Sequence, residues 1–259
     1  MKQVIQIRCK NNKKSQKVEI GSTLFDIFSA FDLKMTHGPV SARVNNKVEG
    51  MHYRVYNSKD VEFLDMTSSS GSRAYTRTLF FVLCKAVQDI YPATDVVIDI
   101  PVSNGFYVDI RLGRPVVDED VNIIRRRMQE IIDARMPIRR FTVPTEEAVA
   151  LFQEKGDVEK VKLLKTSGSI YTTYYKIGDY VDYYYGTLLT NTSQLYLFGL
   201  EKYYDGMLLR IPSLKNPDVL GEMTRQDKMF EILKEELRWQ SIQGISTVGD
   251  FNQAIDANH

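Results

Sequence analysis

The sequence is poor in histidine and cysteine, the side chains that metal sites and nucleophilic catalysis use most often. It has 259 residues and only two cysteines, Cys9 and Cys84, which form no C-x-x-C motif. A disulfide framework is therefore not expected, and a reducing cytoplasm is the predicted location. The three histidines are His37, His52 and His259. So few histidines leave little for metal or acid–base chemistry, and neither a metal site nor a catalytic residue is predicted.

Two longer patterns are also missing. No apolar run reaches the ~18 residues of a membrane-spanning helix, so no membrane partner is expected. The first residues, MKQVIQIRCKNNKKSQK, lack the apolar centre of a signal peptide. No G-x-x-x-x-G-K-[ST] motif occurs, so this chain by itself is not expected to be a P-loop kinase.

What is present is an ordinary globular composition, with 43% hydrophobic and 26% charged residues. The 34 basic and 33 acidic residues give a formal net charge of +1, which excludes a globally basic nucleic-acid coat but allows a local basic face. The length predicts one or two domains.

The first 66 residues predict a small β-grasp domain. Residues 4–9 and 16–20 alternate as strands, and 24–31 have the spacing of a short amphipathic helix after the cap residues Ser22 and Thr23. Short strands are expected at 40–46, around 51–56 and at 61–65. The polar segment 67–72 is expected to be a flexible connector and a domain boundary.

Residues 73–220 predict a larger α+β domain. Helices are expected over 73–91, 118–135 and 145–155, the last capped by Thr145, and a hairpin turns at Ser103-Asn104-Gly105. The tyrosine-dense stretch 170–186 and the segments 195–201 and 206–211 are expected to be strands. Residues 221–259 predict an amphipathic helix over 225–240 and a loose tail, as in a linker towards a missing C-terminal domain.

Several short motifs occur in a fixed order along the chain. They are Gln88-Asp89-Ile90-Tyr91-Pro92, Asn104-Gly105-Phe106-Tyr107 with Asp109, Glu119-Asp120-Val121 with Arg127-Met128, Gly156 with Lys160-Val161, and Tyr180-Val181-Asp182 with Gly186. In this order they resemble the N-terminal half of threonyl-tRNA synthetases. Residues 1–66 resemble the TGS domain, and 73–220 resemble the second additional domain, which in the synthetase hydrolyses mischarged tRNA.

The resemblance fails at the editing chemistry. The family carries His-x-x-x-His on the first helix of that domain and Cys-x-x-x-His after Tyr-Val-Asp. Here the four positions are Arg77, Phe81, Tyr184 and Leu188. Phenylalanine and leucine cannot bind a metal or move a proton, so neither deacylation nor zinc binding by the family's mechanism is expected.

The same pair of domains resembles the front of bacterial fusion proteins in which a uridine-kinase-like domain follows. This likeness implies a non-catalytic, ligand- or RNA-binding regulatory region of a nucleoside (uridine) kinase. ATP and Mg²⁺ are then expected only in the downstream kinase domain, and no cofactor in this chain. The alternatives are a freestanding aminoacyl-tRNA editing hydrolase or tRNA-binding protein, and a module that only assembles with its partners.

The candidate ligand-binding cleft lies in the second domain. Its expected ligand is a nucleoside, a nucleotide or an amino acid, and its candidate residues are Arg77, Lys85, Lys160, Asp182 and Tyr184. The alternative is structural: ion pairs for Arg77, Lys160 and Asp182, and a solvated Lys85. On a strand, Tyr183 and Tyr185 face one way and Tyr184 the other, so these tyrosines either stack on a base or pack as half-buried strand residues.

A second candidate surface is basic and lies near the N-terminus. No acidic residue precedes Glu19, whereas the first hairpin carries Lys2, Arg8, Lys10, Lys13, Lys14 and Lys17. These charges could contact RNA phosphates, or they form a solvated edge that discourages strand pairing.

Overall fold

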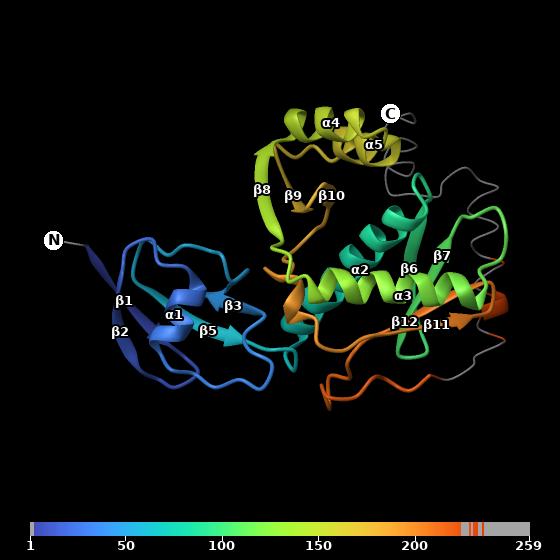
Figure 1. Ribbon diagram of the computed structural model, residues 1–259. Helices are drawn as coiled ribbons and strands as arrows, with labels where there is room; N and C mark the ends of the chain where they lie inside the picture. The colour runs from blue at the N-terminus through green and yellow to red at the C-terminus, as the bar shows by residue number, and fades with distance from the viewer. Residues whose placement is uncertain (1–2, 224–227, 229, 233–234, 236–259) are drawn as a thin grey trace. The chain divides into compact units, whose positions relative to one another are not determined.

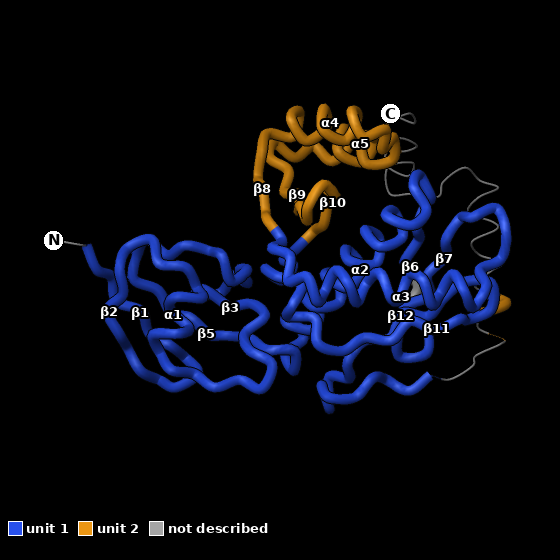
Figure 2. Tube along the Cα trace, in the orientation of Figure 1, with its two compact units in different colours: residues 1–138, 186–223 blue, residues 139–185, 224–259 orange. Residues whose placement is uncertain are grey.

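The computed structural model describes residues 3–223, 228, 230–232 and 235, and it has a mixed α+β fold with three separate sheets (Figure 1). The chain divides into two compact units (Figure 2). Unit 1 comprises residues 1–138 and 186–223, and unit 2 comprises residues 139–185 and 224–259.

Unit 1 begins with a five-stranded sheet of order β2-β1-β5-β3-β4. β1 (Val4–Cys9) and β2 (Ser15–Glu19) form an antiparallel hairpin, and β5 (Lys59–Leu64) pairs parallel with β1. β3 (Ser41–Val44) and β4 (Lys47–Glu49) complete the sheet. Alternate side chains of β1 point into a core shared with α1 (Leu24–Ala30). Thr23 caps α1, which confirms the predicted cap, and with Asp26 it forms a capping box.

The rest of unit 1 contains a four-stranded antiparallel sheet of order β11-β12-β7-β6. Its strands are β6 (Val96–Val102), β7 (Gly105–Ile110), β11 (Gly199–Tyr203) and β12 (Gly206–Arg210). The helices are α2 (Ser69–Ile90), α3 (Asp118–Asp133) and the short 3₁₀ helix η1 (Thr192–Gln194), and α2 packs on α3 and β6. Ser103 and Asn104 both have positive φ, which confirms the predicted hairpin turn.

Within residues 139–185, unit 2 contains a three-stranded antiparallel sheet of order β10-β9-β8 and two helices. The elements are β8 (Arg139–Pro144), α4 (Thr145–Glu154), α5 (Val158–Thr166), β9 (Tyr171–Ile177) and β10 (Tyr180–Tyr183). Ala148, Phe152, Leu164 and Val181 form its small buried core. β9 and β10 both lie within residues 170–186, so the strands predicted in this tyrosine-dense stretch are confirmed.

The expected flexible connector at 67–72 is wrong. Ser68 caps α2, which begins at Ser69, and Gly71 and Ser72 are buried within its first turns. A Cβ atom on Gly71 would lie 1.9 Å from the carbonyl oxygen of Asp65. Glycine is thus required here for close packing, although a Ser/Gly-rich segment is typical of a flexible linker.

Three smaller expectations also need correction. Residues 51–56 form turns and a single bridge from Arg54 to Thr23, not a strand. Thr145 is the first residue of α4 and not its cap, which is Pro144. α5 was not predicted, although Asp157 caps it in the ordinary way for a helix start.

The helix expected over 225–240 and the tail behind it lie almost entirely outside the described residues. Across the described ranges, no helix is both long enough and apolar enough to cross a membrane.

Candidate functional site

In unit 2, Lys160 and Asp182 form an ion pair, as their sequence positions suggest. Lys160 Nζ lies 2.9 Å from Asp182 Oδ1 and 2.6 Å from Asp157 Oδ2. The ammonium also lies 5.7 Å from the centre of the Phe152 ring. The Lys160 side chain is 29% exposed, whereas that of Asp182 is 9% exposed. The pair therefore joins α5 to β10 at a half-buried position.

Burial by itself lowers the pKa of Lys160, but the charges of Asp182 and Asp157 outweigh it and hold that pKa above its ordinary value. Lys160 is thus a fixed cation and not a proton acceptor at neutral pH.

Both carboxylate oxygens of Asp182 are engaged by neighbouring groups. Its Oδ1 also accepts a 2.6 Å hydrogen bond from the Tyr183 amide, and its Oδ2 accepts a 2.8 Å bond from the Tyr180 hydroxyl. Three donors to one carboxylate fix its orientation. The arrangement can present one positive charge to solvent beside α5, but it offers no general base.

Arg77 lies in unit 1, on α2, where its guanidinium packs against Gly186. A Cβ atom on Gly186 would lie 2.7 Å from Arg77 Nη1 and 2.8 Å from Arg77 Cζ. Gly186 also has φ +108, a conformation that L side chains rarely adopt. Arg77 is half-buried, and its place is defined by the glycine that follows the tyrosine run.

Phe81 and Leu188, two of the four residues that the resemblance aligns with editing positions, belong to the hydrophobic core of unit 1. Phe81 is 0% exposed and Leu188 is 2% exposed. Next to Leu188, the Leu189 amide donates a 2.9 Å hydrogen bond to the Thr78 hydroxyl, which fixes this segment against α2. The side chains of Phe81 and Leu188 have no lone pair that could accept a proton from water, and burial keeps water away from both. Neither residue can therefore take part in hydrolysis.

Lys85 is not solvated, contrary to the structural alternative considered for it. Its side chain is 6% exposed and its Nζ lies 3.1 Å from Asp89 Oδ1. The other Asp89 oxygen lies 2.9 Å from Arg127, so the ion pairs link α2 to α3. Lys85 lies on the face of α2 that packs on α3, which favours burial of its long aliphatic stem. The Asp89 carboxylate, one helical turn away, then pairs with the buried ammonium.

The tyrosine run does not form one continuous strand. β10 ends at Tyr183, whose ring packs against the core of unit 2, while Tyr185 is 87% exposed. The expectation that Tyr183 and Tyr185 share a face is therefore wrong, because the alternation of a strand stops before Tyr184. Tyr184 itself is half-buried.

The described N-terminal basic residues lie on the outside of the first hairpin. Arg8, Lys10, Lys13, Lys14 and Lys17 are exposed, and β2 is an edge strand. Lys2 lies outside the described residues. The structure thus presents five positive charges on one hairpin, which we call the basic hairpin surface.

The predicted cleft residues divide between the two units. Lys160, Asp182 and Tyr184 belong to unit 2, whereas Arg77 and Lys85 belong to unit 1. A single cleft that contains both sets remains a prediction.

Asp157 was missed, although an aspartate directly before a helix is a cap signal that would have placed it beside Lys160. Within the described ranges, no group of three or more His, Cys, Asp or Glu side chains is placed to hold a metal ion.

Comparison with known proteins gives a consistent set of relatives. No protein-family model matches the chain. Threonine–tRNA ligase of Acetivibrio thermocellus is 29% identical over 181 residues, which is 70% of this chain and 28% of the ligase. The ligase of Clostridium kluyveri is 30% identical over 193 residues, or 74% of this chain and 30% of the ligase. That of Syntrophotalea carbinolica is 30% identical over 224 residues, or 82% of this chain and 35% of the ligase.

The chain thus spans about a third of the length of these relatives, all of which are ligases. These relatives give no support to the expected kinase fusion. The matched part reaches 70–82% of the chain, and the chain therefore contains a domain homologous to threonyl-tRNA synthetase.

Proposed function

We propose that this chain is a non-hydrolytic, tRNA-binding region related to the N-terminal part of threonyl-tRNA synthetase, with a TGS domain at residues 1–66. Two observations support the proposal: the homology to the ligases, and the burial of two residues that the resemblance aligns with editing positions. Phe81 and Leu188 stand at two of the editing positions, and both are buried in the core.

The proposal excludes hydrolysis for a chemical reason. Cleavage of an aminoacyl ester needs a group that positions or deprotonates water. Lys160 is a cation with a raised pKa, and Asp182 is occupied by Lys160, Tyr180 and Tyr183. No histidine occurs between His52 and His259 in the sequence to replace the missing groups.

The basic hairpin surface supports the RNA-binding part of the proposal. Exposed lysine and arginine side chains bind phosphates through counterion release, which gives affinity without base recognition. The whole chain has a net charge of only +1, so the positive charge of this hairpin is a local excess and not a property of the whole surface.

A binding assay tests the proposal directly. We expect labelled threonine-acceptor tRNA to bind the full chain, with an affinity that falls steeply as salt rises. The double variant Lys10→Glu/Lys14→Glu weakens binding and lowers the slope of log K against log salt by roughly 0.9 for each phosphate that the protein no longer neutralises. The matched control, Lys165→Glu/Lys215→Glu, makes the same charge change at exposed positions outside the hairpin and leaves binding unchanged. Equal losses in both variants, or no binding at low salt, would refute RNA binding through this surface.

A second assay addresses the hydrolase alternative. The chain is incubated with mischarged threonine-acceptor tRNA, and release of the amino acid is compared with the uncatalysed rate. We expect no release above background. Release that disappears in Lys160→Ala or Asp182→Ala would overturn the proposal in favour of an editing hydrolase.

A further inference from the structure

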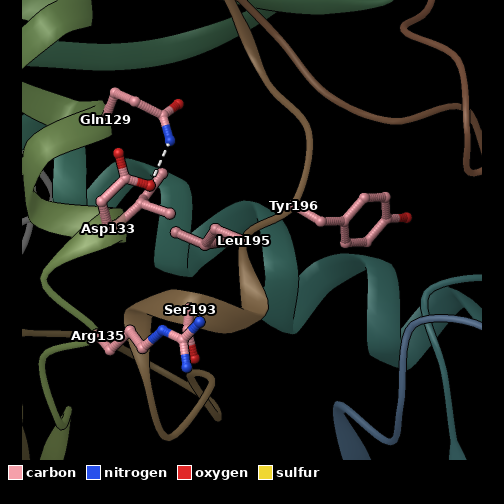
Figure 3. A pocket seen from close by; sticks show the side chains of 7 residues that line it. Gln129, Asp133, Arg135, Ser193, Leu195 and Tyr196 are labelled. Atoms are coloured by element: carbon pink, nitrogen blue, oxygen red, sulfur yellow. Dashed lines mark hydrogen bonds between the residues drawn. The ribbon is translucent and has the colours of Figure 1, made fainter.

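A separate cavity lies in unit 1, away from the residues discussed so far. Its volume is about 450 Å³, within the range of small-molecule sites. One wall is the end of α3 and the turn after it, with Gln129, Asp133 and Arg135. The other is η1 and the two residues that follow it, Leu195 and Tyr196 (Figure 3). Buried Ile132 and Leu195 supply its apolar floor.

Hydrogen bonds across the two walls form the cavity before any ligand binds. Thr192 Oγ1 donates to the Ile131 carbonyl at 2.9 Å and accepts from the Met136 amide at 2.9 Å. The Asn191 side chain donates to the Arg135 carbonyl at 2.8 Å. Arg135 has φ +49, a backbone conformation that this bonding holds in place. A site that is already formed loses little ordering entropy on binding.

The cavity carries one charge of each sign, and the two do not neutralise each other. Gln129 Nε2 donates to Asp133 Oδ1 at 2.8 Å, which leaves Asp133 Oδ2 for another donor. The Arg135 guanidinium has no side-chain partner among the described residues. In Figure 3 the side chains of Asp133 and Arg135 lie apart, with Leu195 between them.

The helix end adds to this polarity. Asp133 is the last residue of α3, where the unpaired carbonyl groups carry partial negative charge. A ligand ammonium is therefore favoured beside Asp133, and a ligand carboxylate is favoured beside the planar fork of Arg135.

We propose that this cavity binds a free α-amino acid, with its ammonium group at Asp133, its carboxylate at Arg135 and its side chain over Ile132 and Leu195. The ligand is net neutral, like the pair of charges that holds it. This inference is independent of the proposed RNA binding, because none of its residues belongs to the basic hairpin surface.

The test is calorimetric titration of the full chain with each of the common L-amino acids, and with propionate and ethylamine as half-ligands. We expect at least one amino acid to bind, and both half-ligands to bind at least about tenfold more weakly. Amide shifts in nuclear magnetic resonance then locate the site at Ser193 and Leu195.

Two charge-removing variants, Asp133→Asn and Arg135→Gln, each lower the affinity at least about tenfold. Both positions are exposed, and circular dichroism melts check that the variants fold. Arg111→Gln, at an exposed position that does not line the cavity, is the control and keeps full affinity. No binding of any amino acid up to roughly 10 mM, equal binding of a half-ligand, or unchanged affinity in both variants would overturn the proposal.

Discussion

The guanidinium of Arg77 occupies the space that a side chain at residue 186 would need. A Cβ atom on Gly186 would meet Arg77 Nη1 at 2.7 Å, and the backbone of Gly186 has φ +108. The two residues are far apart in sequence. Arg77 nevertheless leaves no room for a side chain at residue 186, and a side chain there would have to displace the Arg77 guanidinium.

Gly186→Ala is therefore expected to destabilise the protein by about 1–3 kcal/mol, through steric overlap and backbone strain together. Gly113→Ala is the matched control, because Gly113 also has a positive φ of +72 but nothing within 4 Å of its Cβ position. Urea unfolding of both variants measures the difference.

A double-mutant cycle separates the overlap from the strain. If the overlap matters, Arg77→Ala recovers part of the loss when it is combined with Gly186→Ala. Additive effects of the two substitutions would show that backbone strain alone is responsible.

Asp182→Asn is expected to destabilise the protein by about 1–3 kcal/mol, because the amide cannot balance the Lys160 ammonium. The loss stays below that of a fully buried broken pair, since Lys160 is 29% exposed and keeps Asp157 at 2.6 Å. Asp157→Asn retains the cap of α5 and is expected to have a smaller effect. An equal loss in the two variants, by denaturant midpoint, would contradict this order.

The same ion pair predicts behaviour at alkaline pH. The folded-state pKa of Lys160 lies above its ordinary value of 10.5. The stabilisation is therefore complete below the unfolded pKa of about 10.4 and is lost as the pH rises through the folded-state pKa. Wild type should lose more unfolding free energy than Lys160→Met when the pH is raised above about 10. Parallel curves for the two proteins would contradict the shift.

Asp120 predicts the opposite dependence at acidic pH. It is 3% exposed and accepts two hydrogen bonds from Arg114, one from the Tyr91 hydroxyl and one from the Val117 amide. Hydrogen bonds from Arg114 hold the pKa of Asp120 well below its ordinary value, against the effect of burial. Its stabilisation is present above the unfolded pKa of about 3.9 and is lost as the pH falls through the folded-state value.

Wild type should therefore lose stability more steeply between about pH 5 and pH 2 than Asp120→Asn does. At neutral pH that variant should be less stable by about 2–3 kcal/mol. The exposed Asp118, in the same helical turn, gives the control Asp118→Asn with a wild-type acid slope.

Tyr75 predicts the effect of removing one buried hydroxyl. The Tyr75 hydroxyl donates to the Leu197 carbonyl at 2.8 Å and accepts from the Leu197 amide at 3.0 Å, and the residue is 0% exposed. Tyr75→Phe leaves both backbone groups without this partner and should cost about 1–3 kcal/mol in thermal or chemical unfolding. Tyr171→Phe, at a 65% exposed position, should be neutral.

Much of the local structure was predictable from periodicity and turn chemistry. The helix cap at Thr23 and the hairpin at Ser103-Asn104 are both predictable, because each depends on residues close together in sequence. The segment 67–72 was not, because Gly71 is required by the carbonyl of Asp65 packed against it. Packing that exists only in the folded state leaves no trace in composition.

The candidate site shows the same limit. An ion pair between Lys160 and Asp182 was the structural alternative to ligand binding, and the structure places Lys160 Nζ 2.9 Å from Asp182 Oδ1. The burial of Lys85 was missed, because it depends on Asp89 and on how α2 packs against α3. The cavity beside Arg135 could not be foreseen either, since it is formed by segments from distant parts of the sequence.

The chain leaves unit 1 at Ile138 and returns to it at Gly186. The Ile138 amide donates to the Thr190 carbonyl at 2.9 Å, and Pro137 bridges to Asn191, so the outgoing and returning backbones are already paired at that junction. Residues 139–185 are thus an insert on a closed stem, and all three strands of the sheet they form come from within it. A short turn could replace the insert without opening either sheet of unit 1, which makes this stem a natural place for the protein to gain or lose a module.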